Sequence, residues 1–352
     1  MLWVDKHRPN RLDSLDYAPN ITKRLQALSE DKNIPHLLFY GPSGSGKKTR
    51  INALLRAIFG PTADRLRLDK RTFTTPTKRT VEINMICSNV HIELSPGDAG
   101  LYDRYVIQDV IKEMASNKAL TSGTITTKKD GSEPNAGTEF KVVVLNEVDR
   151  LSKQAQASLR RTMEKYTSSC RLILCCANQS KVIEPVRSRC LGIRVAAPSH
   201  DDICRVLKLV SRKEQFTLPD ELAINIARES GRNIRRAILM LEACKVQQNI
   251  LTADQPVQKT DWELYISQLA MDCAREQSPQ KLLAAREKLY ELLINCIPAD
   301  VILKTLALEL MKNLDDSLKH EVIEWAAFYE HRLCQGSKDI FHLEAFIAKF
   351  MA

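Results

Sequence analysis

Residues 41–47 combine the side-chain types and the spacing that bind a phosphate chain. The stretch reads Gly41-Pro42-Ser43-Gly44-Ser45-Gly46-Lys47. Its glycines allow backbone N–H groups to close around phosphate oxygens, and Lys47 can reach the terminal phosphates. The apolar run 36–40 predicts a buried strand before the loop, and helical spacing in 47–58 predicts a helix after it. Because an incidental glycine-rich turn needs neither flanking element, we expect this loop to bind a nucleotide, either ATP or ADP.

The position after Lys47 is where such a loop normally supplies a ligand to Mg²⁺. A serine or threonine hydroxyl binds the ion there, but this sequence has Lys48. Thr49 follows one residue later, about 100° further round a helix, and does not replace that hydroxyl. The loop therefore lacks its magnesium ligand.

A second phosphate-site motif runs from Val142 to Glu147. Four apolar residues normally precede an aspartate that helps to hold Mg²⁺, and a glutamate that activates the attacking water often follows. Here Asn146 stands in the aspartate position, whereas Glu147 remains as a candidate base. A neutral amide is a poorer partner than a carboxylate for a hard cation. We therefore expect nucleotide binding with weak or no hydrolysis, an idle Glu147 and no metal site; an active ATPase is the alternative.

Apolar periodicity places these motifs in an alternation of strands and helices. Strands are expected at 36–40, 91–94, 141–145 and 171–177, and helices at 47–58, 105–114 and 154–165. The β-branched run 141–145 is typical of a strand buried on both sides in a parallel sheet. The pattern predicts an α/β domain with right-handed crossovers.

Two segments interrupt this alternation, and helices replace it after Pro198. The basic segment 61–80 is expected to be a loop or an added hairpin, and the polar segment 116–139 a surface insertion. Beyond Pro198, helices are expected at 200–213, 219–229 and 232–247, followed by a polar break at 252–262 and a helical remainder. The expected domains are 1–197, 198–251 and 252–352.

The composition is that of an ordinary globular chain. Of 352 residues, 44% are hydrophobic and 27% are charged, and the 12 glycines and 14 prolines are too few for a collagen-like or low-complexity sequence. No apolar run approaches the roughly 18 residues that span a bilayer, and Asp5 and Pro9 interrupt the apolar stretch that a secretory signal needs. The ten cysteines include no C-x-x-C pair, so we expect reduced thiols rather than a zinc site or a disulfide framework.

The formal net charge of +9 is concentrated near the N-terminus. Residues 1–80 contain 16 Lys and Arg against 7 Asp and Glu. A concentrated positive region attracts phosphate-bearing partners, although a solvated basic face explains the charge equally well. A stand-alone nucleic-acid-binding protein is therefore one interpretation of the charge by itself.

The order of motifs along the whole chain resembles that of the AAA+ clamp-loader small subunits of eukaryotic replication factor C. Besides the phosphate loop and LNEVD at 145–149, the motifs are WVDKHRP at 3–9, LRRTMEKYT at 159–167, CAN at 176–178, RSRC at 187–190 and RNIRRAI at 232–238. The altered magnesium positions and the insertion favour the subunit at one end of the family's arc of five. A stand-alone protein would need neither an arginine finger nor a helical lid.

The resemblance implies a fold and a set of partners. The fold is an AAA+ P-loop domain with a parallel sheet, a small helical lid and an all-α collar, which should be the main assembly surface at 263–352. The partners are four other clamp-loader subunits in a heteropentamer, a ring-shaped sliding clamp and primer-template DNA, in replication and repair in the nucleus. Family contacts with DNA go to the phosphate backbone without reading bases, and Lys112, Arg150 and Lys153 stand where such contacts fall.

The resemblance also implies roles for individual residues. Asn178 matches a sensor of the terminal phosphate, Arg235 a second sensor on the lid, and Val4 and Arg8 the surroundings of the base. Arg189 matches an arginine finger that acts in the neighbouring subunit's site. The expected nucleotide-binding residues are Val4, Arg8, Gly41, Pro42, Ser43, Gly44, Ser45, Gly46, Lys47, Lys48, Thr49, Asn146, Asn178 and Arg235.

The second-sensor motif departs from the family's usual G-D-M-R-R-A-L-N. Arg232, Asn233 and Leu239 replace its glycine, aspartate and final asparagine. These departures concern the coupling between this chain's own lid and the phosphates.

Overall fold

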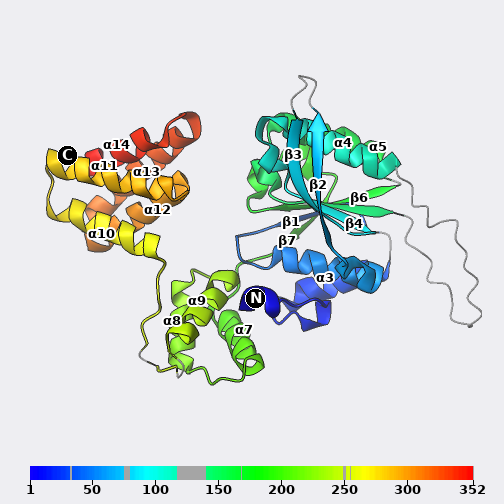
Figure 1. Cartoon of the computed structure of the whole chain (residues 1–352), viewed down its shortest axis with the longest axis horizontal. Coiled ribbons are helices and arrows are strands. Elements are labelled where there is room, and N and C mark those ends of the chain that lie inside the picture. The colour runs from blue at the N-terminus through cyan, green and yellow to red at the C-terminus, as the bar shows by residue number, and fades with distance from the viewer. Residues whose placement is uncertain are drawn as a thin grey trace, which may run out of the picture. The chain divides into compact units, whose positions relative to one another are not determined.

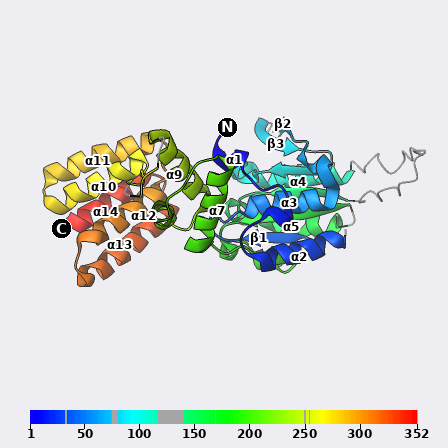
Figure 2. The same cartoon turned by 90° about the horizontal axis from the view of Figure 1, so that it is seen from below.

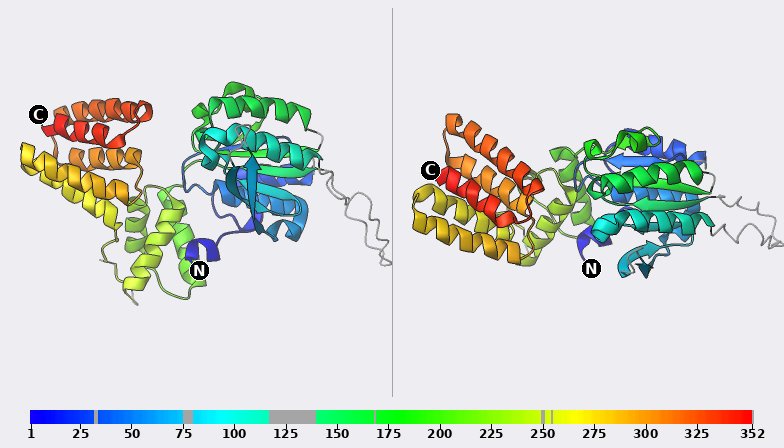
Figure 3. Two further views of the ribbon diagram at one scale, coloured as in Figure 1. Left: turned by 45° about the horizontal axis from the view of Figure 1, so that its top comes forward. Right: turned by 90° about the horizontal axis from the view of Figure 1, so that it is seen from above.

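The computed structural model describes residues 1–31, 34–74, 80–116, 140–167, 169–248, 251–253 and 255–351. The chain forms two compact units, Met1–Val257 and Gln258–Ala352, whose elements are labelled in Figure 1 and seen from other directions in Figure 2 and Figure 3. The insertion expected at 116–139 lies outside the described residues except for Ser116. Within the described ranges, the helices lack the combination of length and apolar character that crossing a membrane requires. All ten cysteines are described, and all are thiols.

A seven-stranded sheet in the order β2-β3-β4-β5-β6-β1-β7 forms the framework of the first unit. Its strands are β1 Leu37–Tyr40, β2 Arg67–Thr74, β3 Thr80–Cys87, β4 His91–Leu94, β5 Lys141–Leu145, β6 Cys170–Cys176 and β7 Leu191–Arg194. Strands β4, β5, β6, β1 and β7 pair in parallel, whereas β2 and β3 form an antiparallel hairpin beside β4. The expected parallel α/β fold is confirmed. For the basic segment 61–80, a loop or an added hairpin was expected, and the structure has a hairpin. Its second strand extends beyond this segment to Cys87.

The helices of the first unit follow the expected alternation closely. They are α1 Trp3–Lys6, α2 Pro19–Glu30, α3 Lys47–Phe59, α4 Asp103–Ser116, α5 Lys153–Lys165, α6 Glu184–Arg187, α7 His200–Lys213, α8 Asp220–Glu229 and α9 Ile234–Gln247. Short 3-10 helices lie at 12–14, 60–64, 96–102, 148–150 and 179–181. The sequence patterns missed α1, α2, α6 and β7, most of which are short.

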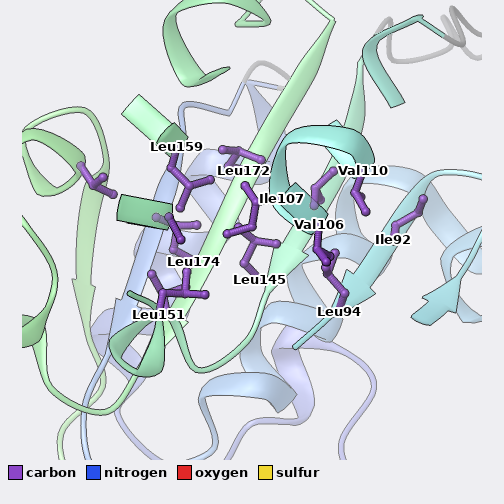
Figure 4. Close-up of a cluster of buried hydrophobic side chains, with 14 of the residues drawn as sticks. Ile92, Leu94, Val106, Ile107, Val110, Leu145, Leu151, Leu159, Leu172 and Leu174 are labelled. Atoms are coloured by element: carbon purple, nitrogen blue, oxygen red, sulfur yellow. The ribbon is translucent and has the colours of Figure 1, made fainter. Parts of the chain in front are cut away.

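The pleat of the sheet distributes its apolar side chains between two helical layers. In β5, Val143 and Leu145 join the cluster that contains side chains of α4 and α5, shown in Figure 4. Val142 and Val144 join the opposite cluster, with side chains of α2 and α3. Since successive strand side chains point to opposite faces, a strand covered on both faces must be apolar throughout. The layers hold the carboxyl ends of β1, β4, β5 and β6 at one edge of the sheet.

Helices α7, α8 and α9 form a small bundle with its own apolar cluster. Ser199 caps α7 in a capping box with Asp202, which fixes where the helix begins. The N-terminal α1 packs on this bundle, where the Trp3 ring stacks on Phe216 at 5.5 Å between centroids. The Trp3 backbone N–H donates to Glu242 Oε2 at 3.1 Å. The bundle therefore carries the first residues of the chain.

The second unit is helical, as expected from its periodicity. Its helices are α10 Asp261–Arg275, α11 Pro279–Ile294, α12 Ala299–Leu310, α13 Asp316–Gln335 and α14 Asp339–Met351. Leu303 and Leu306 of α12 and Phe346 of α14 are buried in one apolar cluster. Thr260 and Glu263 form a capping box at the start of α10.

Candidate nucleotide-binding site

The phosphate loop joins the end of β1 to the start of α3, as the sequence predicts. Gly41 has φ +151° and Gly44 has φ +71°, backbone conformations that favour glycine. A Cβ atom on Gly41 would lie 1.9 Å from the Val195 carbonyl oxygen, and one on Gly44 would lie 1.8 Å from Asn233 Oδ1. Both positions therefore require glycine for close approach as well as for φ.

Polar contacts hold the loop in a defined shape. Lys47 Nζ donates to the carbonyl oxygens of Gly41 at 2.7 Å and Pro42 at 2.9 Å, so its ammonium lies within the loop. Ser45 is fully buried, and its hydroxyl donates to the Pro42 carbonyl oxygen at 2.8 Å. The Ser45 carbonyl oxygen in turn accepts a hydrogen bond from the Tyr17 hydroxyl. These contacts connect the loop residues to one another and hold the Lys47 ammonium beside the loop carbonyl groups.

Tyr17 is itself positioned by a fully buried arginine, Arg50 of α3. Arg50 Nη2 donates to the Tyr17 carbonyl oxygen at 2.7 Å and Nη1 to Thr22 Oγ1 at 3.2 Å, while the guanidinium lies 4.6 Å from the Tyr17 ring centroid. Burial raises the pKa of the Tyr17 hydroxyl, and the Arg50 charge opposes that rise. Sequence reasoning missed both residues. The available signal was an arginine on the apolar face of the helix at 47–58.

A pocket of about 340 Å³ lies between the loop, the N-terminal segment and the helical bundle. It brings together six of the predicted residues: Val4, Arg8, Gly44, Gly46, Thr49 and Arg235. Leu209, Val210 and Ile238 give the wall on the bundle side an apolar character. A cavity with one apolar wall and another lined by loop glycines and cationic residues suits a nucleotide, whose base is flat and whose phosphates are anionic.

The N-terminal wall of the pocket is tied to the bundle by charge. Lys6 Nζ lies 2.6 Å from Glu214 Oε1, and His7 Nε2 contacts the same oxygen. The hydrogen bonds from Lys6 and His7 lower the pKa of Glu214. Arg8 contacts Asp5 at 3.6 Å and stays available to the pocket that it lines.

The bundle also touches the phosphate loop directly, at the start of α9. The Ile234 backbone N–H donates to the Gly44 carbonyl oxygen at 3.3 Å. Asn233 caps α9 by accepting the Arg236 N–H at 3.2 Å, which an aspartate does equally well. Arg232 takes φ +62°, a conformation that suits the glycine usual in the family, and donates to the Pro198 carbonyl oxygen at 2.9 Å. The departures in the second-sensor motif therefore leave the lid in contact with the loop.

The two altered magnesium positions meet at a third residue, Glu93 of β4. Lys48 Nζ lies 2.6 Å from Glu93 Oε1, and Asn146 Nδ2 donates to the same oxygen at 3.0 Å. Sequence reasoning missed Glu93, whose signal was a carboxylate inside the apolar strand 91–94. The side chain of Glu147 is exposed, and its Oε2 lies 3.0 Å from Arg150 Nη1.

Asn178 lies at the carboxyl end of β6, with its side chain exposed. Asp149 Oδ2 accepts the backbone N–H of Ala177 at 3.1 Å and of Asn178 at 3.2 Å, which fixes this end of the strand. Burial raises the pKa of the nearby Cys175 thiol to about 11, while Lys47 lowers it and Asp149 raises it. Because β6 neighbours β1 in the sheet, Asn178 lies just beyond the strand next to the one that leads into the phosphate loop. It does not line the pocket.

Arg189, the expected arginine finger, lies two residues after the end of α6. Its Nη2 lies 2.6 Å from Glu164 Oε1, its Nε donates to the same oxygen at 2.9 Å, and its Nη1 donates to the Pro185 carbonyl oxygen at 2.7 Å. The hydrogen bond from Arg189 lowers the pKa of Glu164, whose side chain is half exposed. A local carboxylate thus holds the guanidinium within the single chain.

The three residues expected near DNA have different surroundings. Arg150 is three-quarters exposed and pairs with Glu147, and Lys153 is exposed at the start of α5. The side chain of Lys112 lies outside the described residues. Arg150 and Lys153 share one surface region, at the junction of a 3-10 helix and α5.

Three family models match parts of the chain. The model described as Replication factor C subunit 3, C-terminal domain, matches residues 262–352. The model described as RCF1/5-like, AAA+ ATPase lid domain, matches residues 205–246. The model described as DNA polymerase III, delta subunit, matches residues 17–199.

Full-length relatives and solved structures agree with these matches. The Oryza sativa protein named Replication factor C subunit 5 is 53% identical and covers 100% of this chain and 97% of its own. Replication factor C subunit 3 of Homo sapiens is 52% identical, and the match covers 100% of this chain and 95% of the human protein. The solved structure of the Thermotoga maritima RuvB Holliday junction branch migration motor has a TM-score of 0.50 to this chain at 17% identity. The match covers 80% of this chain and 85% of the RuvB chain. At that identity it shows the AAA+ fold alone.

Proposed function

We propose a function for this chain, which belongs to the family of replication factor C subunits 3 and 5. On this proposal it is a nucleotide-binding subunit of a sliding-clamp loader. It would join four other loader subunits in a heteropentamer that opens a ring-shaped clamp and places it on primer-template DNA. Its place would be the nucleus, in replication and repair. The resemblance of motifs over the whole chain supports this assignment.

The pocket between Gly44, Val4 and Arg235 is the observation that carries the nucleotide-binding part. Its apolar side faces the bundle, and Gly44, Gly46 and Thr49 on either side of Lys47 line its other side. ADP or ATP placed there contacts the core, the lid and the N-terminal segment together. Such a nucleotide would stabilise the unit in the manner of any ligand that binds only the folded state.

The same chain is proposed to hydrolyse its nucleotide weakly or not at all. Lys48 and Asn146 provide no anionic or hydroxyl oxygen at the magnesium positions, and Glu147 pairs with Arg150. The alternative, an active ATPase subunit, keeps Glu147 as the base. Hydrolysis by the purified chain in Mg²⁺ at the rate of an ordinary AAA+ subunit would favour that alternative.

Arg189 is proposed to act in the site of a neighbouring subunit. A guanidinium offers a planar fork of donors to phosphate oxygens, which lysine cannot match. Glu164 would hold this fork at the surface until the neighbour's nucleotide replaces the carboxylate. Arg150 and Lys153 are proposed to contact the DNA backbone, together with Lys112.

The collar at 252–352 is proposed to be the main assembly surface, beside a core at 1–197 and a lid at 198–251. Apolar side chains on the collar helices support this, since Ile294 is 76% exposed and Ile323 51% exposed. Ile294→Lys and Ile323→Lys, made separately, should each reduce co-purification of the other loader subunits without changing the helical circular dichroism. Normal co-purification of both variants would contradict this part of the proposal.

The proposal of nucleotide binding is tested by titrating the full chain with a fluorescent ADP or ATP analogue. Wild-type protein should bind, and Lys47→Ala should lose affinity by about tenfold to a hundredfold, as expected for a charge-assisted hydrogen bond. Lys153→Ala, which changes an exposed lysine beyond the pocket, serves as the matched control. A wild-type chain that binds neither nucleotide would overturn the assignment.

A further inference from the structure

The end of β4 carries an ion pair at the place where a P-loop site normally holds Mg²⁺. Lys48, Glu93 and Asn146, here named the Lys48 triad, share the single oxygen Glu93 Oε1. The Glu93 side chain is only 6% exposed, whereas that of Lys48 is 36% exposed. Lys48 and Asn146 stand in the two positions that supply magnesium ligands in this fold.

The donors of the Lys48 triad do not fit Mg²⁺. This ion demands oxygen ligands in near-octahedral geometry, but an ammonium has no lone pair to offer. Asn146 turns its NH₂ group toward Glu93, and the ammonium already neutralises that carboxylate. Across the residues with described positions, no group of three or more His, Cys, Asp or Glu side chains could hold a metal ion.

We propose that the Lys48 ammonium is a built-in cation for the nucleotide's phosphates, so that ADP or ATP binds this chain without Mg²⁺. The inference rests on the proposed function, because it requires a nucleotide in the loop. Lys48 follows Lys47 in the first turn of α3, beside the phosphate loop. An ammonium has three N–H donors, and the contact with Glu93 accounts for one, which leaves donors for phosphate oxygens.

The other two members of the Lys48 triad position this cation. Glu93 follows His91 and Ile92 in a strand whose four residues are all buried, and a carboxylate there is costly unless it is paired. The Asn146 amide holds the same oxygen from β5, the neighbouring parallel strand. Glu93, which Asn146 also contacts, therefore holds the partly exposed Lys48 ammonium at the edge of the sheet where the loop lies. A purely structural ion pair would not need to coincide with both magnesium positions.

The test compares nucleotide binding with and without Mg²⁺, with N-methylanthraniloyl-ADP as the probe and the full chain as the protein. Wild-type affinity in EDTA should lie within about twofold of that in MgCl₂, since no ligand set awaits the ion. The double variant Lys48→Met/Glu93→Gln removes the cation without leaving a buried carboxylate unpaired. Its affinity should fall by about tenfold to a hundredfold in either buffer.

The matched control is Lys319→Met/Asp316→Asn, a lysine of equal exposure paired at 2.8 Å in the second unit. It should bind the probe like wild type. Wild-type binding that requires Mg²⁺, or unchanged binding by the Lys48→Met/Glu93→Gln variant, would overturn the inference while leaving nucleotide binding intact. Absence of any probe binding by wild type in both buffers would overturn the proposed function instead. The wild-type comparison decides even where the double variant does not fold.

Discussion

The candidate nucleotide pocket and segment 184–190, here named the Arg189 edge, match different parts of an ATPase site. The pocket is lined by glycines of the phosphate loop, which also carries Lys47, but Lys48 and Asn146 stand where metal ligands are normal. The edge retains an arginine whose guanidinium is held ready by Glu164. On the proposed function, this chain would bind one nucleotide in its own pocket and help to hydrolyse another in a neighbouring site.

The contacts of the two regions also differ. Pocket residues are fixed by buried hydrogen bonds, such as that of the Tyr17 hydroxyl to the Ser45 carbonyl oxygen. The Arg189–Glu164 pair is partly exposed, and exposed pairs contribute only about 0–1 kcal/mol to stability. The pocket can therefore serve the fold, whereas the arginine can leave its carboxylate at little cost.

The largest expected effect comes from Arg189→Ala at the edge. An arginine finger supplied in trans is worth roughly 10³–10⁵ in rate, so hydrolysis at the neighbouring site should fall by a large part of that factor. Nucleotide binding in this chain's own pocket should not change. The measurement is clamp- and DNA-stimulated ATP hydrolysis by the whole assembly, with its other sites blocked.

Arg160→Ala is the matched control for the edge. Arg160 also approaches Glu164, at 3.6 Å, and its side chain is 53% exposed. Its loss should leave hydrolysis by the assembly unchanged. Equal hydrolysis by wild type and the Arg189→Ala assembly would mean that the edge holds a structural ion pair and that the contrast with the pocket is wrong.

The sequence predicts most of the framework because local patterns determine it. The strands at 91–94 and 141–145 have the predicted bounds, since their apolar runs end in polar residues. Strand β7 at 191–194 was missed because its residues are mostly exposed and include Gly192. It forms only because β1 offers a parallel edge, with Leu37 opposite Leu191.

The site is less predictable than the framework, because its new residues are joined over long separations. Lys48 reveals a missing ligand by its position in the loop, but its partner Glu93 comes from another strand. Tyr17 reaches Ser45 through a contact between residues 28 positions apart. Such contacts depend on packing of α3 against the sheet and α2, which no local spacing encodes.

A smaller effect is expected from Tyr17→Phe, which tests whether buried bonds fix the pocket. The substitution leaves the Ser45 carbonyl oxygen without its donor, at a cost of about 1–3 kcal/mol in the free energy of unfolding. Nucleotide affinity should fall with it, because Tyr17 lines the pocket. Denaturant unfolding and nucleotide titration measure the two effects. Tyr105→Phe, at an exposed position on α4, should change neither; if Tyr17→Phe also changes neither, the loop does not depend on this bond.

The smallest effect is expected from Asn178→Ala, which asks whether the pocket still senses a terminal phosphate. The Asn178 side chain is exposed, and its backbone is held by Asp149, so the free energy of unfolding should change by less than about 0.5 kcal/mol. If the amide contacts a γ-phosphate, ATP affinity should fall by about fivefold, the worth of one hydrogen bond, while ADP affinity stays constant. Separate titrations with ATP and ADP give that ratio, with Ser180→Ala on the adjoining exposed turn as the control. An equal loss for both nucleotides would place Asn178 among the residues that only bind, and no loss would remove it from the site. Either result would leave Lys47 and Arg235 as the residues of this chain that are expected to contact the terminal phosphate of its own nucleotide.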